Sequence, residues 1–288
     1  MSSNMVRRVA FAVVAIPLLV GAVWIGEWAL AAVLAVAATL GTDELFNLAE
    51  RTGVKPLRSI GRVLSAAVPF LMVVMLVTRP NRLMLTDAWG YLAVAAVLIV
   101  VGAAVFMRTP EQRPIAAIAI TLMAPLYTAV LPSTAFIIRH AQWGGKSWAG
   151  TVLVLFPMIV TWVCDSAAMF GGQRIGGPKL APSISPGKTR AGALAGVAGG
   201  TAAGVLLTVL VFPRTGVVLG VLPAAVLALV ISVIAQVGDL AESLLKREAG
   251  VKDSSALIPG HGGVLDRLDS LYFAIPVAAI GYHLLGLT

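Results

Sequence analysis

The sequence predicts an all-α fold, that of a polytopic integral membrane protein with about nine transmembrane helices. Of its 288 residues, 59% are hydrophobic and 12% are charged, and the mean hydropathy is +0.94. These values lie far outside the range of soluble domains. Apolar stretches of about 20 residues, the length that crosses roughly 30 Å of hydrocarbon as a helix, recur along the whole chain.

Each predicted span is one such apolar stretch. In chain order the nine spans cover 9–28, 29–49, 60–77, 88–107, 115–138, 148–170, 191–211, 217–237 and 270–287. We expect the first to be retained as a helix, because no small-residue cleavage site precedes a soluble domain and further spans follow at once. The spans divide into a transmembrane scaffold, 1–140, and a catalytic transmembrane region, 141–288, with cytoplasmic loops at 171–190 and 238–269.

The distribution of Lys and Arg predicts the orientation. Positively charged loops stay in the cytoplasm, and an N-terminus on that side leaves few basic residues outside: Arg79, Arg82, Arg139, Lys146 and Arg214. We therefore expect a protein of the inner, cytoplasmic membrane whose N-terminus and functional loops face the cytoplasm. The net charge of +8 then reflects topology and attraction to anionic headgroups, so the expected partner is the lipid bilayer and not nucleic acid.

The stretch SPGKT, from Ser185, ends like a phosphate-binding P-loop but does not fit one. A P-loop needs a glycine five positions before Gly187, on a turn that leaves a β-strand, so that backbone N–H groups wrap the phosphates. Pro182 stands there and supplies no N–H, and the surrounding sequence shows no sign of a strand. The segment still offers cations and hydroxyls that suit phosphate: Ser185, Lys188, Thr189 and Arg190.

Acidic residues gather around the last two large cytoplasmic loops: Asp165, Asp239, Glu242, Glu248, Asp253, Asp266 and Asp269. Charge at the edge of hydrocarbon is costly without a partner or a cavity, so this concentration predicts a functional site. Asp239 is the first acid after a long apolar span, and we favour a functional role for it over that of a merely solvated residue. A continuing helix puts Glu242 and Lys246 on the same face, and for these two a solvated ion pair at the helix end is the alternative.

The stretch IPGHGGVLDRLD, from Ile258, supplies a glycine loop and two more carboxylates. Pro259 and the glycines break any helix and leave His261 between two of them. Asp266 follows the glycine turn, so we expect it to face Asp239 across the loop. Asp269 opens the ninth span, where a simple helix cap is the alternative.

Two carboxylates that converge from different helices, amid Lys and Arg, suit a divalent cation that itself holds phosphate oxygens. Zinc is not expected, since the single cysteine and three histidines do not pair at ligand spacing. Phosphoryl and nucleotidyl transfer depend on metal charge and cationic clamps. Mg²⁺ is therefore the expected cofactor, with a second cation, monovalent or divalent, left open.

Around these residues runs a longer pattern of fixed identities: Ser243, Leu245, Lys246, Arg247, Lys252, Asp253, Ser255, Ile258, Pro259, His261, Gly262, Gly263, Val264, Asp266, Arg267, Leu268 and Asp269. It resembles the signature of the phosphatidate cytidylyltransferases, also called CDP-diacylglycerol synthases. The upstream stretches CDSAAMFGG, SISPGKT and QVGDLAESLLKR resemble the family in order and spacing. The N-terminal half is similar to the family only in hydropathy, apart from the stretch DELF, from Asp43, which weakly resembles the position of a family acid near the second span. The chain departs from the family at Gly187, where a second lysine is frequent, and near Gly177, where a basic residue is.

The resemblance implies a reaction in which CTP and phosphatidic acid give CDP-diacylglycerol and diphosphate, by Mg²⁺-dependent in-line attack on the α-phosphorus. It implies that Asp239 and Asp266 hold the metal, with Asp165 as a further ligand or as the residue that orients Lys188. The other implied site residues neutralise phosphate, support catalysis or close the loop on CTP: Lys246, Arg247, Lys252, Asp253, His261, Gly262, Gly263, Arg267 and Asp269.

Two other functions stay open: a CTP-dependent lipid kinase, which would release CDP, and a secondary transporter, for which the intramembrane Asp165 is an argument. The gathering of ionisable residues on one side disfavours the transporter. Glycines at every fourth position of the seventh span predict close helix packing, within one chain or across a homodimer: Gly192, Gly196, Gly200 and Gly204.

Overall fold

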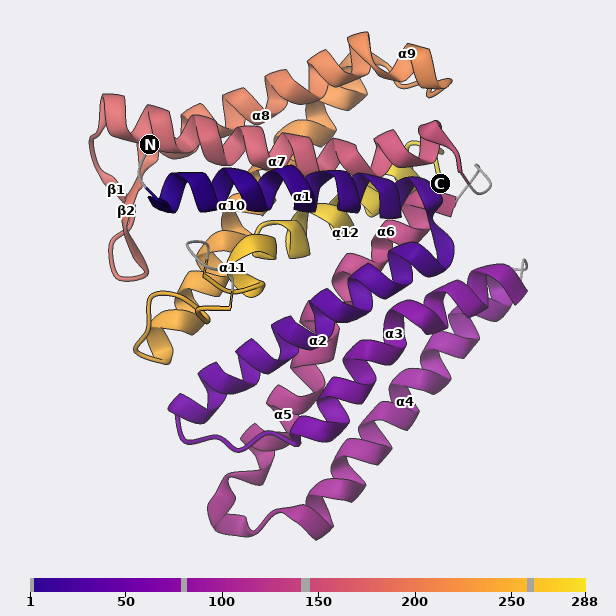
Figure 1. The fold of residues 1–288 in the computed structure, drawn as a ribbon, viewed down its shortest axis with the longest axis vertical. Coiled ribbons are helices and arrows are strands. Elements are labelled where there is room, and N and C mark those ends of the chain that lie inside the picture. Colours follow the sequence, from indigo (N-terminus) through magenta and orange to yellow (C-terminus); the bar gives the residue numbers. More distant parts are fainter. Residues whose placement is uncertain (1–2, 79–81, 141–145, 258–261) are drawn as a thin grey trace.

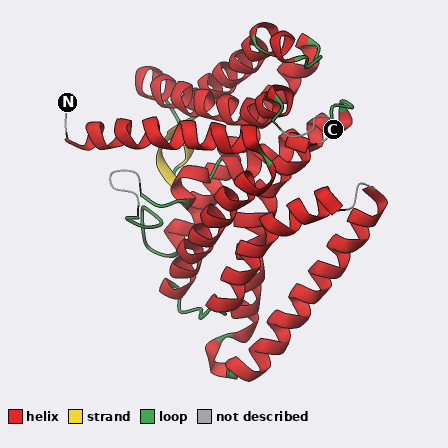
Figure 2. Ribbon diagram, turned by 45° about the vertical axis from the view of Figure 1, so that its right-hand side comes forward, coloured by secondary structure: helices red, strands yellow, loops and turns green. Residues whose placement is uncertain are grey.

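The computed structural model describes residues 3–78, 82–140, 146–257 and 262–288, and it is almost entirely helical (Figures 1 and 2). The first half contains α1 (Ser3–Ile25), α2 (Glu27–Arg51), α3 (Arg58–Thr78), α4 (Arg82–Met107), a short 3₁₀ turn (Pro110–Gln112), α5 (Pro114–Pro125), the π-helical turn η2 (Leu126–Val130) and α6 (Leu131–His140). The second contains α7 (Trp148–Ile175), β1 (Lys179–Ala181), β2 (Ser185–Thr189), α8 (Arg190–Leu210), α9 (Phe212–Thr215), α10 (Val221–Glu248), α11 (Leu265–Leu268) and α12 (Leu271–Leu284).

The predicted class, an all-α polytopic membrane protein, is confirmed. Seven segments among the described residues are long and apolar enough to cross a bilayer: Glu27–Arg51, Arg58–Leu76, Ala88–Met107, Pro114–His140, Trp148–Ile175, Arg190–Leu210 and Val221–Glu248. The count of nine is not confirmed. The helix in the ninth predicted span, α12, has 14 residues and at 1.5 Å per residue reaches about 21 Å, short of a 30 Å hydrocarbon core.

The fifth predicted span is one continuous rod with a local change of winding. Between α5 and α6 the chain makes one π-helical turn, in which the N–H of Leu131 donates to the carbonyl of Leu126, five residues back. Pro132 follows, and a proline has no N–H to continue the ordinary ladder. The wider turn keeps the rod unbroken across this point.

Two predicted loops contain more regular structure than expected. α7 continues to Ile175, and β1 then pairs antiparallel with β2, with Lys179 opposite Thr189 and Ala181 opposite Ser185. The expectation that no strand adjoins SPGKT was therefore wrong. The tight turn at 182–184 lets the two segments pair, although neither is apolar enough to be recognised as a strand from the sequence. Likewise α10 runs to Glu248, so the first part of the predicted loop 238–269 is helix.

The glycines of α8 are packed against the chain's own helices. All four of the regularly spaced glycines are buried. A Cβ on Gly196 would lie 2.9 Å from the carbonyl oxygen of Cys164 in α7, and one on Gly204 would overlap Ala228 in α10. The close packing predicted from this spacing is confirmed within one chain.

The predicted scaffold and catalytic regions share one apolar core. Its buried side chains come from both: Val23, Phe136, Phe156, Ile231 and Tyr282 are among them. The turns at 52–57 and 108–113, the β-hairpin and the end of α10 lie at one end of the molecule, on the left and lower left of Figure 1, whereas α9 and the C-terminus lie at the other. The hairpin therefore shares its end of the molecule with the basic turns of the N-terminal half.

Candidate active site

A cavity of about 780 Å³ lies between α7, the β-hairpin, the end of α10 and the stretches 252–253 and 266–269. It brings together most of the residues predicted for the site: Asp165, Ser185, Lys188, Thr189, Asp239, Lys246, Arg247, Lys252, Asp253, Asp266, Arg267 and Asp269. Segments separated by more than 80 positions in the sequence thus meet on one surface, and polar groups from each of them face it.

Lys188 and Asp239 form an ion pair across the cavity. Lys188 comes from the second strand of the hairpin and Asp239 from α10, and each side chain is 29% exposed. Ser243, one turn further along α10, directs its hydroxyl toward the other oxygen of Asp239 at 3.4 Å. The lysine of SPGKT therefore faces the acid that the sequence singled out, although the segment is a strand and not a P-loop.

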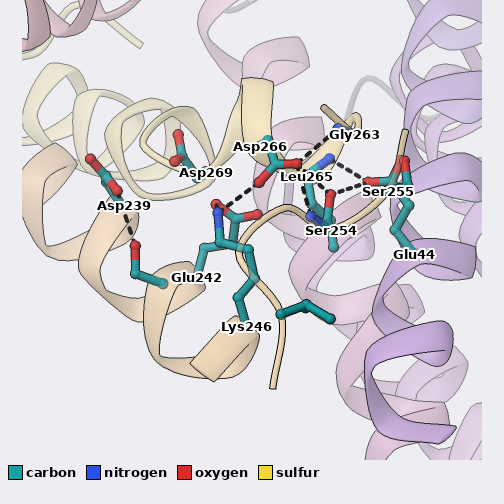
Figure 3. Close-up of polar contacts among 12 residues, drawn as sticks. Glu44, Asp239, Glu242, Lys246, Ser254, Ser255, Gly263, Leu265, Asp266 and Asp269 are labelled. Atoms are coloured by element: carbon teal, nitrogen blue, oxygen red, sulfur yellow. Dashed lines mark hydrogen bonds and ion pairs between the residues drawn. The ribbon is translucent and has the colours of Figure 1, made fainter. Parts of the chain in front are cut away.

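Lys246 lies between two carboxylates in the wall of the cavity (Figure 3). Its Nζ donates to Oδ1 of Asp266 at 2.6 Å and to Oε2 of Glu242 at 3.1 Å. The Glu242 side chain is 0% exposed. A solvated ion pair at a helix end, the alternative considered for Glu242 and Lys246, is therefore wrong, because the pair is buried and includes a third charged group.

Asp266 is held by hydrogen bonds from the segment that precedes it. Its Oδ2 accepts from the backbone N–H of Ser254 at 2.9 Å, the Ser254 hydroxyl at 2.8 Å and the backbone N–H of Gly263 at 2.8 Å. Burial alone would raise the pKa of Asp266, but the Lys246 ammonium and these hydrogen bonds outweigh it and hold the pKa below its usual range. The expected juxtaposition with Asp239 is limited to a shared cavity, since the contacts of Asp266 are with Lys246, Ser254 and Gly263.

Asp269 lines the cavity at the position before Ser270, which is the N-cap of α12, and α12 has no side-chain cap hydrogen bond, so the helix-cap alternative for Asp269 is wrong. Its Oδ1 accepts only a local hydrogen bond from the backbone N–H of Ser270, at 2.6 Å. Burial, and after it the Asp239 carboxylate, raise the pKa of Asp269 to about 6. The carboxylates on this wall therefore repel one another, and a bound cation would relieve that repulsion.

Arg247 connects the hairpin to the end of α10. Its Nε donates to the carbonyl of Ile184, at the hairpin tip, at 3.1 Å, and its Nη1 donates to the carbonyl of Val251 at 2.8 Å. Lys252 and Arg267 are exposed at the cavity. These three exposed residues of the lining give the cavity wall positive charge.

Some predicted residues lie away from the cavity or outside the described chain. His261 falls in the stretch 258–261, outside the described residues. Arg190 is exposed at the start of α8, and neither it nor Gly262 and Gly263 belongs to the described lining. Gly262 has φ +80° and lies against the Asp266 carboxylate, so the two glycines shape the turn that carries Asp266.

The sequence analysis missed two residues of this region, Glu44 and Gln236. Glu44, in the stretch DELF, accepts hydrogen bonds from Ser254 and Ser255. The only signal for it in the sequence was the weak resemblance of this stretch to the family. Gln236 lines the cavity and donates from its amide to the carbonyl of Ala193 at 3.2 Å. A polar residue that interrupts an apolar helix face one turn before Asp239 was a usable signal for it.

The described lining of the cavity offers Mg²⁺ separate carboxylates rather than a preassembled group of ligands. Among the described residues, no three or more His, Cys, Asp or Glu side chains are arranged to hold a metal, so Asp165, Asp239 and Asp266 do not form a preassembled ligand group. Mg²⁺ does not need one, because it is ordinarily held by one or two carboxylates, waters and substrate phosphates. Asp165 and Asp239, which face the same cavity, fit that pattern. Asp239 already meets Lys188 and Ser243, one at each oxygen, but Asp266 is engaged more fully, because it accepts four hydrogen bonds.

Comparison with known proteins gives consistent matches. A family model described as the cytidylyltransferase family matches residues 6–285. A phosphatidate cytidylyltransferase of Pseudomonas aeruginosa is 35% identical over 278 residues, 95% of each chain, and one of Synechocystis is 32% identical over 293 residues, 94% of each chain. One of Brucella suis is 50% identical over 125 residues, which span 43% of this chain and 44% of that relative, less than half of its length.

Proposed function

This chain belongs to the cytidylyltransferase family, and from that premise we propose that it transfers the cytidylyl group of CTP to phosphatidic acid. The products are CDP-diacylglycerol and diphosphate. The observation that carries the proposal is the charged cavity, in which acids and cations from α7, the hairpin, α10 and the stretches 252–253 and 266–269 face one volume large enough for a nucleoside triphosphate.

The bond changes follow from the two substrates. A phosphate oxygen of phosphatidic acid forms a bond to the α-phosphorus of CTP, while the bond from that phosphorus to the diphosphate oxygen breaks and the electron pair leaves with diphosphate. The attacking oxygen is already anionic, so no strong general base is needed. Catalysis then depends on positioning and on cations that meet the spread negative charge.

The chain's cations are placed for that task. Lys188 reaches the cavity from the hairpin, Arg247 connects the hairpin to α10, and Lys252 and Arg267 are exposed residues of the cavity lining. Each would neutralise phosphate oxygens in a partly enclosed site, where such contacts are worth more than in water. Lys246 stays in place through its two carboxylate partners.

We propose Asp239 and Asp165 as the protein ligands of Mg²⁺, which supplies positive charge at the phosphates. Asp269 adds negative charge beside them. Asp266, the third ligand expected from the family resemblance, is proposed instead to hold Lys246 and the turn at Gly263, because its oxygens already accept four hydrogen bonds.

The cavity also suits a lipid substrate. Its wall includes Met169 of α7, which is 51% exposed, so the polar volume adjoins an apolar outer surface. Phosphatidic acid could then keep its acyl chains in the bilayer while CTP enters from water. We place the end of the molecule that carries the hairpin in the cytoplasm, at the inner membrane, because the basic turns at 52–57 and 108–113 lie at the same end.

The test uses purified protein, phosphatidic acid in detergent micelles, Mg²⁺ and CTP labelled at the α-phosphate. Wild type should move label into the lipid phase. Asp239→Ala should lower that rate by about 100-fold or more, a loss typical of removing a group that stabilises charge in the transition state. EDTA should stop transfer and added Mg²⁺ should restore it. Glu248→Ala, at the exposed end of α10 and outside the cavity lining, is the matched control.

The label's position separates the alternatives. Lipid labelled only from γ-labelled CTP, with CDP released, would identify a lipid kinase. Movement of a solute across liposomes without CTP consumption would identify a transporter. Absence of α-label in the lipid from folded wild-type protein would refute the proposed transfer.

A further inference from the structure

Glu44 is a buried acid far from the cavity in sequence and outside its lining. It lies in α2, in the N-terminal half, and is only 3% exposed. Its partners lie more than 200 positions later in the chain. A buried carboxylate is costly unless hydrogen bonds satisfy it, so these partners reveal what the residue does.

Four donors converge on the Glu44 carboxylate (Figure 3). Oε1 accepts from the Ser255 hydroxyl at 2.7 Å and from the N–H of Val264 at 2.9 Å. Oε2 accepts from the Ser254 hydroxyl at 2.9 Å and from the N–H of Leu265 at 2.8 Å. Each oxygen thus receives one hydroxyl and one backbone amide, and only an acceptor-only group such as a carboxylate matches this arrangement.

Ser254 connects Glu44 to the cavity. Its Oγ lies 2.9 Å from Oε2 of Glu44 and 2.8 Å from Oδ2 of Asp266, and its single hydrogen can be shared between them. Asp266 in turn receives Lys246. A continuous chain of contacts therefore runs from α2 through Ser254 and Asp266 to the lysine in the cavity wall.

Gly263 shows how closely these groups approach. A Cβ at this position would overlap both the Ser254 hydroxyl and the Glu44 carboxylate. The glycine is therefore required by the space that Glu44 and Ser254 occupy, and the turn before Asp266 is built around the Glu44 side chain.

We propose that Glu44 is a positioning residue for the nucleotidyl transfer. Its carboxylate fixes the two stretches Ser254–Ser255 and Gly263–Leu265 against α2, and through them it fixes Asp266 and Lys246. This role rests on the proposed function for its effect on rate, whereas its effect on the order of the two stretches does not depend on which reaction the cavity supports.

The first test is Glu44→Gln, which keeps size and shape but turns one acceptor oxygen into a donor that faces a backbone N–H. We expect kcat per folded molecule to fall about 10- to 100-fold, as for a small misplacement of reacting groups. The KM for CTP should change less than about threefold, since Lys188 and Arg247 keep their own partners. Asp43→Asn, at the neighbouring position with its partners Arg58 and Arg62, is the control.

A second pair of variants removes one hydroxyl each and leaves the carboxylate in place. Ser254→Ala breaks the connection between Glu44 and Asp266, whereas Ser255→Ala removes a hydrogen bond to Glu44 and one from the N–H of Leu257 and leaves Asp266 its partners. Ser254→Ala should lower kcat about tenfold, and Ser255→Ala by less than about threefold. A purely structural role would lower the melting temperature of both while leaving kcat of the folded protein at the wild-type value, and that result would overturn the proposal.

Hydrogen exchange supplies a readout without substrate. In Glu44→Gln, or in Ser254→Ala if the first variant does not fold, the amides of residues 262–266 should exchange faster while those in the middle of α10 keep the wild-type rate. Unchanged exchange at 262–266 would refute the positioning role. If wild type shows no transfer from CTP, the proposed function fails by itself, and the exchange comparison still decides the role of Glu44.

Discussion

Charged residues at the cavity are divided between two arrangements with different partners. Lys188 pairs with Asp239 near the hairpin, and Lys246 joins Glu242 and Asp266 further along α10. Asp269 lies beside both arrangements and accepts a local backbone hydrogen bond from Ser270. Its ionisation is therefore less compensated than that of Asp266, which has the Lys246 ammonium as a direct partner.

This imbalance predicts that ionisation of Asp269 lowers the free energy of unfolding in a pH-dependent way. Because its pKa is raised from 3.8 to about 6, the folded protein holds this proton more tightly than the unfolded chain does. The free energy of unfolding should therefore fall as pH rises from about 4 to about 6, and it should stay low above that. At 1.36 kcal/mol per pKa unit, the cost is at most about 3 kcal/mol.

Asp269→Asn removes this cost while its side-chain oxygen still accepts from Ser270. Thermal unfolding in detergent with EDTA should show the variant more stable than wild type at pH 8, with a smaller difference at pH 5. The variant should nevertheless lose transfer activity. Equal gains at both pH values would show that ionisation of Asp269 is not the source of the effect.

At the scale of elements, the close contact of α7 with α8 depends on residues without side chains. Gly192 would place a Cβ 2.7 Å from the carbonyl oxygen of Ala168, and Gly196 would place one 2.9 Å from that of Cys164. Backbone atoms of a packed helix cannot move aside as a side-chain end can. The regular glycines are therefore a packing requirement within one chain.

Gly196→Val should lower the free energy of unfolding by about 1–3 kcal/mol, the usual cost of overpacking. Gly102→Val is the matched control, because Gly102 lies in α4, also a candidate span, and a Cβ added there would meet nothing within 4 Å. Both substitutions change helix propensity equally, so the difference between their melting temperatures in detergent isolates the packing. No difference would mean that α8 can shift away from α7.

The hairpin and the end of α10 act together around the cavity. Thr189 ends β2 and caps α8 by accepting from the N–H of Gly192 at 3.0 Å, which directs Lys188 toward Asp239. Arg247 holds the hairpin tip through Ile184. A short hairpin with few apolar side chains is thus held by its neighbours rather than by its own two strands.

At the scale of the whole molecule, the cavity and the basic turns share one end, and the opposite end carries α9 and the C-terminus (Figure 1). CTP is a water-soluble nucleotide of the cytoplasm, and the basic turns favour the same side. The same end should therefore be cytoplasmic.

Labelling of single cysteines tests this orientation. Lys55, in the turn at 52–57, and Arg214, in α9, are both exposed, and these two elements lie at opposite ends of the molecule (Figure 1). Cys164 is buried. In intact spheroplasts a membrane-impermeant maleimide should label Arg214→Cys, whereas Lys55→Cys should react only after permeabilisation. Wild type measures any background from Cys164. The reverse pattern would contradict a cytoplasmic cavity.

The sequence by itself determined the class of protein, most of the spans and the family. A bilayer imposes a length and a hydropathy on each segment separately, so these features can be read locally. The resemblance to the family is confirmed by a match over residues 6–285, and most of the named polar residues do line one cavity. Their roles in metal binding and catalysis stay predictions.

Only the tertiary structure decided which groups are partners. Glu44 meets Ser254 across 210 positions, and Lys188 meets Asp239 from a strand that the sequence did not suggest. The span count also depended on it, since the length of α12 is set by where α11 and the turn at Asp269 end. Hydropathy and spacing describe one segment at a time, whereas a buried carboxylate is stabilised only by donors that packing brings to it.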